Sequence, residues 1–166
     1  MNPEISVIVP VFDEEGNLPR LMQDLTRVLN GMGRSYEVLF VDDGSRDGSA
    51  RLIADATRAD QRIRLIALRR NFGQTAALAA GFDHAHGGIL VTMDADLQND
   101  AEDIPKLIVK LEEGYDLVTG WRQKRRDSFL RNLASSIANS LISKVTRVRV
   151  HDSGCTLKAY RREVVQ

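Results

Sequence analysis

The sequence predicts an α/β fold, in which a mostly parallel sheet carries helices on both of its faces. Across residues 5–120, strand-length apolar runs alternate with segments whose apolar residues recur at helical spacing. The connections between them are short, which favours right-handed crossovers between parallel strands. Polar loops follow four of the runs, at the sheet edge where α/β folds bind their ligands. The chain of 166 residues is long enough for one domain with a proper core.

Five apolar runs are expected to form strands. The first covers residues 5–12 and is rich in β-branched residues, as is typical of a central parallel strand. It should stop at Pro10, because proline cannot donate a hydrogen bond to a neighbouring strand. The other four runs are residues 36–41, 63–68, 88–93 and 115–119, and a last short strand is expected within residues 151–162.

Amphipathic segments predict helices between these strands. The expected helices cover residues 18–29, about 50–56, 75–86 and 101–113. A further amphipathic helix is expected over residues 128–146. It either packs on the core or lies near an apolar acceptor or a membrane surface, and the sequence leaves both interpretations open.

Two carboxylates, Asp94 and Asp96, follow the apolar run of residues 88–93. Carboxylates crowded at the end of a buried strand repel each other, and desolvation penalises both. A hard divalent cation relieves both problems, and Mg²⁺ or Mn²⁺ takes one or two carboxylates together with substrate phosphates. The pattern therefore indicates a metal site, although a solvated turn after a strand is the simpler explanation of an isolated Asp-X-Asp.

Charge is balanced overall but unevenly distributed along the chain. Residues 90–119 hold eight acidic side chains and two lysines, whereas residues 120–150 hold eight basic side chains and one aspartate. This arrangement suits a metal-bridged anionic substrate better than nucleic acid. The single cysteine, Cys155, excludes an internal disulfide and is expected to fill a small pocket. We expect neither a signal peptide nor a membrane span, because no suitable apolar run is present.

Several of the polar loops resemble motifs of the family-2 glycosyltransferases. Residues 9–14 (Val-Pro-Val-Phe-Asp-Glu) resemble the first motif of that family, and residues 41–45 (Val-Asp-Asp-Gly-Ser) resemble the second. Residues 94–98 (Asp-Ala-Asp-Leu-Gln) resemble the metal motif. The resemblance covers nearly the whole chain, with the motifs in the order of the family, and is therefore more specific than any single motif.

The later motifs resemble one branch of the family, the polyprenyl-phosphate sugar transferases, typified by dolichyl-phosphate mannose synthase. They are residues 120–122 (Gly-Trp-Arg) and 152–161. Within this branch, residues 70–74 (Arg-Asn-Phe-Gly-Gln) and 151–155 (His-Asp-Ser-Gly-Cys) are most similar to bacterial enzymes that load undecaprenyl phosphate. The catalytic domain of the family usually continues further, so we expect additional chain after Gln166.

The resemblance implies a GT-A (Rossmann-like) fold and a single catalytic domain over residues 1–166. A nucleotide-sugar half covers about residues 1–98, and an acceptor half, expected to be incomplete, covers about residues 99–166. On the donor side, the implied roles are Pro10, Phe12 and Glu14 lining the nucleotide pocket, Asp42 contacting the base, Asp43 supporting the loop, Asp94 and Asp96 holding Mg²⁺ or Mn²⁺ on the donor diphosphate, and Gln98 in the same loop. Further along the chain, the implied roles are Arg122 and Arg131 near the phosphates, Asp152 in the acceptor-side loop, and Lys158 and Arg161 continuing its basic side. The expected catalytic residues are Asp96, Arg122 and Asp152.

Some of these residues also have simpler explanations. Asp42 and Asp43 are good turn formers. Arg122 could be a solvated surface charge, and the helical register that would orient Arg131 is not fixed by the sequence.

The reaction that the resemblance implies is an inverting, metal-dependent transfer of a sugar from a UDP- or GDP-sugar to a polyprenyl phosphate. The leaving nucleoside diphosphate develops negative charge, which a divalent cation and arginines stabilise. A lipid phosphate is already anionic near pH 7, because the second pKa of a phosphomonoester is about 6. It can therefore attack the sugar without a strong protein base. We expect the protein at the cytoplasmic face of the cell membrane, able to self-associate and not to bind nucleic acid.

Two alternatives stay open. A related transferase could use a sugar hydroxyl as acceptor, in cell-wall or exopolysaccharide synthesis. Such an acceptor needs a general base, for which Asp152 is the candidate. A non-catalytic module that only binds a nucleotide-sugar is the other alternative, and the presence of Asp94, Asp96 and Arg122 argues against it.

Overall fold

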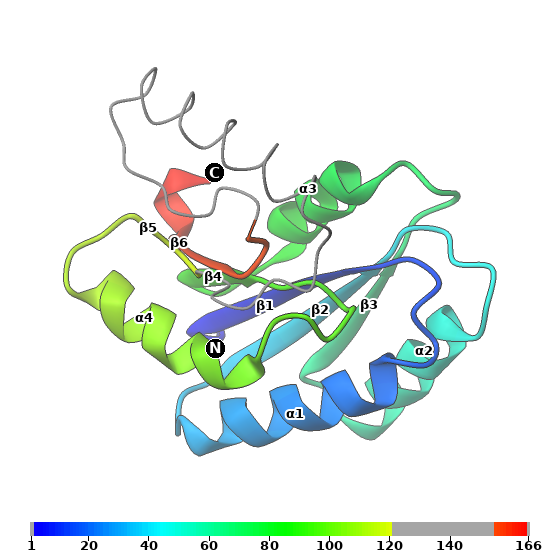
Figure 1. The fold of residues 1–166 in the computed structure, drawn as a ribbon, viewed down its shortest axis with the longest axis horizontal. Coiled ribbons are helices and arrows are strands. Elements are labelled where there is room, and N and C mark those ends of the chain that lie inside the picture. Colours follow the sequence, from blue (N-terminus) through cyan, green and yellow to red (C-terminus); the bar gives the residue numbers. More distant parts are fainter. Residues whose placement is uncertain (1, 121–154, 166) are drawn as a thin grey trace, which may run out of the picture.

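The computed structural model describes residues 2–120 and 155–165, which form a six-stranded sheet with the strand order β3-β2-β1-β4-β6-β5 (Figure 1). The strands are β1 (Ile5–Val11), β2 (Tyr36–Asp42), β3 (Ile63–Ala67), β4 (Ile89–Thr92), β5 (Leu117–Thr119) and β6 (Lys158–Arg161). The helices are α1 (Leu18–Gly31), α2 (Ser49–Ala59), α3 (Gln74–His84) and α4 (Ile104–Glu112), with short 3₁₀ turns at Ala101–Asp103 and Arg162–Val164. The predicted α/β class is confirmed.

Strand β1 continues through Pro10 to Val11, so the expectation that it would stop at Pro10 was wrong. The backbone N–H and C=O groups of alternate residues in a parallel strand point toward the same neighbouring strand. The backbone of Pro10 therefore points toward β4, as that of Ile8 does. The Ile8 carbonyl accepts a hydrogen bond from the Met93 amide at 3.1 Å. Because β4 ends at Thr92, opposite Ile8, no ladder bond is required from residue 10. The missing proline N–H therefore costs the sheet nothing at this position.

Two antiparallel strands complete the sheet beyond β4. Strand β6 pairs with β4, placing Lys158 opposite Thr92 and Arg161 opposite Ile89. Strand β5 pairs with the other edge of β6, also antiparallel. Strand β5 is therefore not a neighbour of β4, because β6 lies between them (Figure 1).

Helices cover both faces of the sheet, as predicted (Figure 1). On one face, α1, α2 and α4 share one apolar cluster with the sheet, and α4 lies against β5 and β6. The cluster includes Val7, Val9, Leu21, Leu25, Phe40, Ile53 and Ile108. On the other face, α3 packs with Ala77 against Ile8 and Leu39. A Cβ atom at Gly81 of α3 would overlap the Ile8 side chain, so the small residues of this helix allow its close approach.

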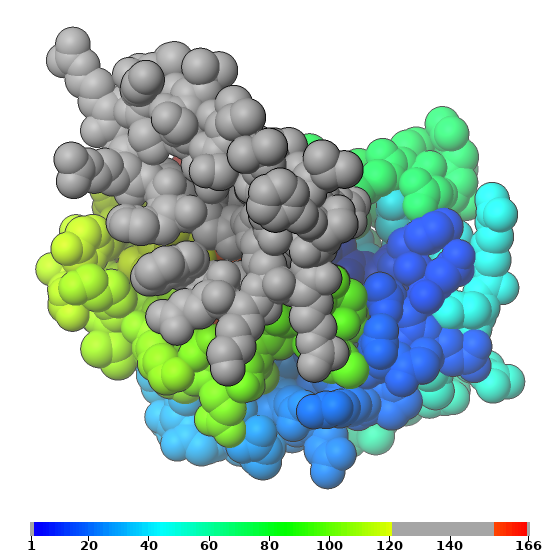
Figure 2. All heavy atoms as spheres, in the orientation of Figure 1, coloured from blue at the N-terminus to red at the C-terminus, as the bar shows by residue number. Residues whose placement is uncertain are grey.

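Figure 2 shows α1, in blue, next to α4, in yellow-green, on the surface of the described part. Two ion pairs join these segments: Arg27 of α1 with Glu102, and Arg34, just after α1, with Glu112 of α4 at 2.7 Å. Arg34 is 27% exposed and the other three side chains are at least 50% exposed, so solvent screening keeps the contribution of both pairs to stability small.

The amphipathic helix predicted over residues 128–146 lies outside the described residues. Among the helices that the structure does describe, none combines the length and the apolar character that crossing a bilayer requires.

Candidate nucleotide-sugar site

A pocket of about 340 Å³ lies where the carboxyl ends of β1, β2 and β4 meet. Six residues predicted from the sequence line it: Pro10, Phe12, Glu14, Asp43, Asp94 and Asp96. They come from three loops that are far apart in the chain. Parallel strands present their carboxyl ends at the same edge of the sheet, which is why these loops converge.

The loop after β1 is fastened to the loop after β2 by hydrogen bonds. The Arg46 amide donates to Asp13 Oδ1 at 2.6 Å, and the Glu14 amide donates to Ser49 Oγ at 2.9 Å. Asp13 has a positive φ of 55°, which is uncommon for a residue with a side chain. The turn leaves the Phe12 ring 39% exposed at the pocket. The two loops therefore form one wall with an aromatic face available to a ligand.

The neighbouring carboxylates Asp42 and Asp43 have different environments, although each is only 3% exposed. Asp43 accepts hydrogen bonds from the Phe72 and Gly73 amides, both at 2.8 Å. It therefore holds the loop between β3 and α3 against the end of β2, as the expected loop-supporting role requires. This arrangement brings Gly73, and with it the start of α3, to the pocket.

Asp42 has an unused acceptor. Its Oδ2 accepts from the Ser45 amide at 3.3 Å, but its buried Oδ1 has no hydrogen-bond partner among the residues that the structure describes. A buried oxygen without a donor costs on the order of 1–3 kcal/mol. A ligand N–H group that reached this oxygen would recover that free energy.

Asp94 and Asp96 lie on the pocket side of the loop that follows β4. Asp94 accepts a hydrogen bond from Gln74 Nε2 at 2.6 Å through Oδ1 and from Thr156 Oγ1 at 2.7 Å through Oδ2. Asp96 Oδ1 accepts from the Gln98 amide at 3.0 Å, and Leu97 between them has a positive φ of 60°. The loop is thus tightly wound and presents both carboxylates on the pocket.

This donor set fits Mg²⁺ or Mn²⁺. Both ions prefer oxygen ligands and bind through one or two carboxylates, with substrate phosphates and water completing the shell. Within residues 2–120 and 155–165, no three metal-ligating side chains come together, so two carboxylates are what this part of the chain offers. An ion held by Asp94 and Asp96 would therefore need oxygen atoms from a bound ligand, which a diphosphate supplies.

Other predicted residues lie elsewhere. Gln98 is exposed and lines a separate hollow beside Arg20 and Asp24. Arg161 lies at the opposite end of β6 from the pocket, where it donates to the carbonyls of Tyr115 at 3.1 Å and Leu111 at 3.2 Å. Its expected place on the basic side of the acceptor loop was therefore wrong.

Lys158, in contrast, lies at the end of β6 nearest the pocket, opposite Thr92. It lines a small cavity of about 80 Å³ together with Gln74, Asp94 and Thr156. Three residues with predicted roles, Arg122, Arg131 and Asp152, lie outside the described residues.

The two side chains that hold Asp94 were given no role from the sequence. Gln74 ends the stretch 70–74, and Thr156 lies in the stretch 152–161, both of which were singled out as motifs. The only available signal was therefore their position in these motifs. Cys155, next to Thr156, is 1% exposed and packs near Asn99, in agreement with the expected pocket-filling role.

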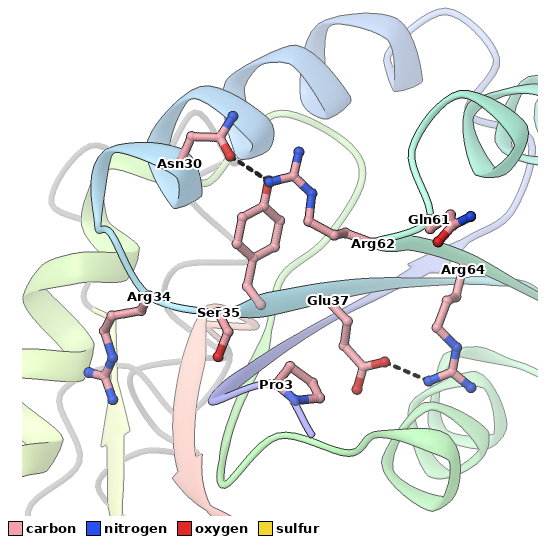
Figure 3. Close-up of a pocket in the computed structure, with 9 residues that line it drawn as sticks. Pro3, Asn30, Arg34, Ser35, Glu37, Gln61, Arg62 and Arg64 are labelled. Atoms are coloured by element: carbon pink, nitrogen blue, oxygen red, sulfur yellow. Dashed lines mark hydrogen bonds and ion pairs between the residues drawn. The ribbon is translucent and has the colours of Figure 1, made fainter. Parts of the chain in front are cut away.

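A second hollow of about 400 Å³ lies at the opposite edge of the sheet, near the amino ends of β2 and β3 (Figure 3). Glu37, which is 5% exposed, points toward Arg64 there and pairs with it at 2.6 Å. Its other oxygen accepts from Ser6 Oγ and from the His86 amide, both at 2.7 Å. Burial alone raises the pKa of Glu37, but the hydrogen bonds from Ser6, Arg64 and His86 outweigh it and lower the pKa. None of the predicted site residues lies in this hollow.

The described part is thus an α/β domain with an acidic pocket at the carboxyl ends of its parallel strands. A family model described as Glycosyl transferase family 2 matches residues 6–166. The chain belongs to glycosyl transferase family 2. The predicted family is therefore confirmed, and the chain is placed among the glycosyltransferases.

Solved structures share this fold. A mycobacterial protein is 21% identical, with a TM-score of 0.76 over 98% of this chain and 54% of that chain. Glucosyl-3-phosphoglycerate synthase from Mycobacterium tuberculosis, in complex with Mn²⁺, UDP and glucosyl-3-phosphoglycerate, is 20% identical, with a TM-score of 0.75 over 98% of this chain and 58% of that one. The same enzyme in complex with Mn²⁺, UDP-glucose and phosphoglyceric acid is 21% identical, with a TM-score of 0.76 over 98% of this chain and 58% of that one. This chain spans little more than half the length of these proteins, and at such identity the likeness shows the fold alone.

Proposed function

We propose that this chain carries the donor-binding and catalytic part of an inverting, metal-dependent glycosyltransferase. The observation that carries the proposal is the pocket in which Asp94 and Asp96 face the loops of Asp42 and Asp43 across the ends of three parallel strands. A nucleoside diphosphate sugar has a base, a diphosphate and a sugar. The pocket offers the carboxylates Asp94 and Asp96. Asp42 precedes the pocket residue Asp43 but is not itself in the pocket lining, and its buried Oδ1 has no partner among the described residues.

The donor is a UDP- or GDP-sugar. The unpaired Asp42 Oδ1 would accept an N–H group of the base, and the exposed Phe12 ring offers a face on which a base can stack. Glucosyl-3-phosphoglycerate synthase, which shares the fold, has been solved with UDP-glucose and Mn²⁺, and this supports UDP as the first donor to test.

Mg²⁺ or Mn²⁺ would be held by Asp94 and Asp96 and by the donor diphosphate. When bound, the ion supplies positive charge that stabilises the leaving diphosphate. The residues of the chain orient the donor: Asp43 fixes the loop of residues 70–73, and the hydrogen bonds on Asp94 fix its carboxylate. Arg122 and Arg131 are proposed to add charge near the phosphates, and Asp152 to act on the acceptor side.

For the acceptor, we favour a polyprenyl phosphate at the cytoplasmic face of the membrane. Support comes from the motif at residues 152–161, which resembles the polyprenyl-phosphate branch. An anionic phosphate needs no strong base for attack. The second candidate is a hydroxyl acceptor, which is favoured by the complexes of the related fold with phosphoglyceric acid. It would require a general base, and Asp152 is the residue to examine.

The first experiment is calorimetric titration of UDP and GDP, each with and without Mn²⁺, into the chain and into Asp96→Asn. Binding of one nucleotide that depends on Mn²⁺, and that is lost in Asp96→Asn, is expected. Asp55→Asn is the matched control, because Asp55 lies on the exposed side of α2 and pairs only with the nearby Arg58 among the contacts described. Absence of metal-dependent binding by the folded wild-type chain would refute the donor site.

Transfer is then measured with the matching nucleotide-sugar and either undecaprenyl phosphate or phosphoglyceric acid as acceptor. Transfer of the sugar to undecaprenyl phosphate, at a rate that does not depend on a titrating protein base, supports the favoured acceptor. Product on the hydroxyl acceptor, with a pH–rate profile that Asp152→Asn changes, would replace it. Binding without turnover on either acceptor would identify a non-catalytic module.

A further inference from the structure

The carboxylate of Asp94 is held from two sides by segments that are distant in the sequence. Gln74 Nε2, in the first turn of α3, donates to Oδ1 at 2.6 Å. Thr156 Oγ1, just before β6, donates to Oδ2 at 2.7 Å. Each carboxylate oxygen can accept more than one hydrogen bond or ligand, so these two contacts do not by themselves prevent Asp94 from binding an ion.

The proton of the Thr156 hydroxyl has a defined direction. Asn99 Nδ2 donates to Thr156 Oγ1 at 3.1 Å, which uses that oxygen as an acceptor. A hydroxyl has one proton to give, and the other neighbour of Oγ1 is the acceptor-only carboxylate of Asp94. The chain of hydrogen bonds therefore runs from Asn99 through Thr156 to Asp94.

Thr156 is itself rigidly placed. Its carbonyl accepts from Thr92 Oγ1 at 2.7 Å, which ties it to β4. Its sequence neighbours Cys155 and Leu157 are 1% and 2% exposed, and Asn99 is 9% exposed. Gln74 differs, because it is exposed at the start of α3 and lines the pocket, where a ligand can move it. Of these two contacts on Asp94, the one from Thr156 is therefore the more firmly fixed.

We propose that Thr156 is a positioning residue that orients the Asp94 carboxylate for the divalent cation of the donor site. The inference rests on the proposed function, in which Asp94 is a metal ligand. Hydrogen bonds to ligating carboxylates fix their orientation, and loss of such a partner typically weakens metal binding by about 10–100-fold. Thr156 and Gln74 are neutral donors, so they orient the carboxylate without adding positive charge that would repel the ion.

The test measures Mn²⁺ affinity in the presence of UDP, by following the electron paramagnetic resonance signal of free Mn²⁺. Thr156→Val keeps the shape of the side chain but removes the hydroxyl, and we expect its Mn²⁺ affinity to fall by about 10–100-fold. Thr156→Ser keeps the hydroxyl and should retain most of the affinity. Thr57→Val is the matched control, because the Thr57 hydroxyl bonds only to the Ile53 carbonyl within α2 among the contacts described.

A second readout separates positioning from a general structural defect. If Thr156 acts through the ion, excess Mn²⁺ should restore nucleotide binding to Thr156→Val. The variant should still unfold cooperatively, at a lower melting temperature than Thr57→Val because Asn99 Nδ2 loses its acceptor. Wild-type Mn²⁺ affinity in folded Thr156→Val would overturn the inference while leaving the proposed function intact. If Thr156→Val does not fold, Thr156→Ala carries the same test, because it places no methyl group against Asn99.

Failure of the proposed function gives a different result. If the wild-type chain binds no Mn²⁺ with UDP present, Asp94 is not a metal ligand, and both proposals are refuted together. Loss of Mn²⁺ binding in Thr156→Val and its return in Thr156→Ser is the result that supports the positioning role.

Discussion

The link between Asp43 and the loop of residues 70–73 allows a quantitative prediction for Asp43→Asn. The carboxylate is 3% exposed and accepts two backbone hydrogen bonds at 2.8 Å, from Phe72 and Gly73. An asparagine can accept only one of them, and its amide group then faces the second backbone N–H. Hydrogen bonds to a charged group contribute about 1.5–3 kcal/mol each, so the substitution should lower the free energy of unfolding by about that amount.

The expected change is large enough to measure by thermal and urea unfolding followed by circular dichroism. For a chain of this size, 1 kcal/mol corresponds to about 2–4 °C, so the melting temperature should fall by about 3–12 °C. Asp55→Asn is the control, because its exposed pair with Arg58 is separated by three residues in a helix and contributes less than about 0.5 kcal/mol. An unfolding free energy of Asp43→Asn within about 0.5 kcal/mol of the wild type would show that the carboxylate does not hold this loop.

Three further predictions concern other parts of the fold and site. Gly44→Ala should destabilise the chain by at least about 1–2 kcal/mol, because Gly44 has a φ of 74° and an added Cβ would meet the backbone of Arg70 at 2.6 Å. Urea unfolding measures this change, and the control Gly16→Ala, which has open space around it, should not destabilise the chain. The pKa of Glu37 is lowered by its hydrogen bonds, against the effect of burial, so the stability it contributes is present above its ordinary value of 4.5 and is lost as the pH falls through the folded value. In acid titrations of unfolding, Glu37→Gln should therefore lose less stability than the wild type, and an equal loss would contradict this assignment. Asp96→Asn should keep its melting temperature while losing metal-dependent nucleotide binding in calorimetry, and retained binding would remove Asp96 from the metal site.

The sequence predicted most of the features that depend on a single strand and the loop after it. Apolar runs located five of the six strands, a short sixth was expected within residues 151–162, and polar residues at the strand ends located the pocket. Because parallel strands share one edge, Phe12, Asp43 and Asp94 could be expected to converge without any knowledge of the tertiary structure. The difference between Asp42 and Asp43 was also anticipated in part, since a supporting role for Asp43 was expected.

The features that the sequence could not provide depend on which distant segments meet. The end of β1 was misplaced because the effect of Pro10 depends on where β4 stops. Arg161 was misplaced because β6 runs antiparallel to β4, which carries its far end away from the pocket. The bond from Thr156 to Asp94 joins residues 62 positions apart, and no local pattern encodes such a contact.

The position of β6 between β4 and β5 has a consequence for how the protein is made. While the ribosome synthesises the chain from Thr92 to Lys158, the outer edge of β4 has no partner strand. At roughly 5–20 residues per second, this interval lasts roughly 3–13 s. An unpaired strand edge is a template for pairing with other chains. Nascent molecules are therefore especially exposed to misassembly, and in need of chaperones, in the interval before β6 leaves the ribosome.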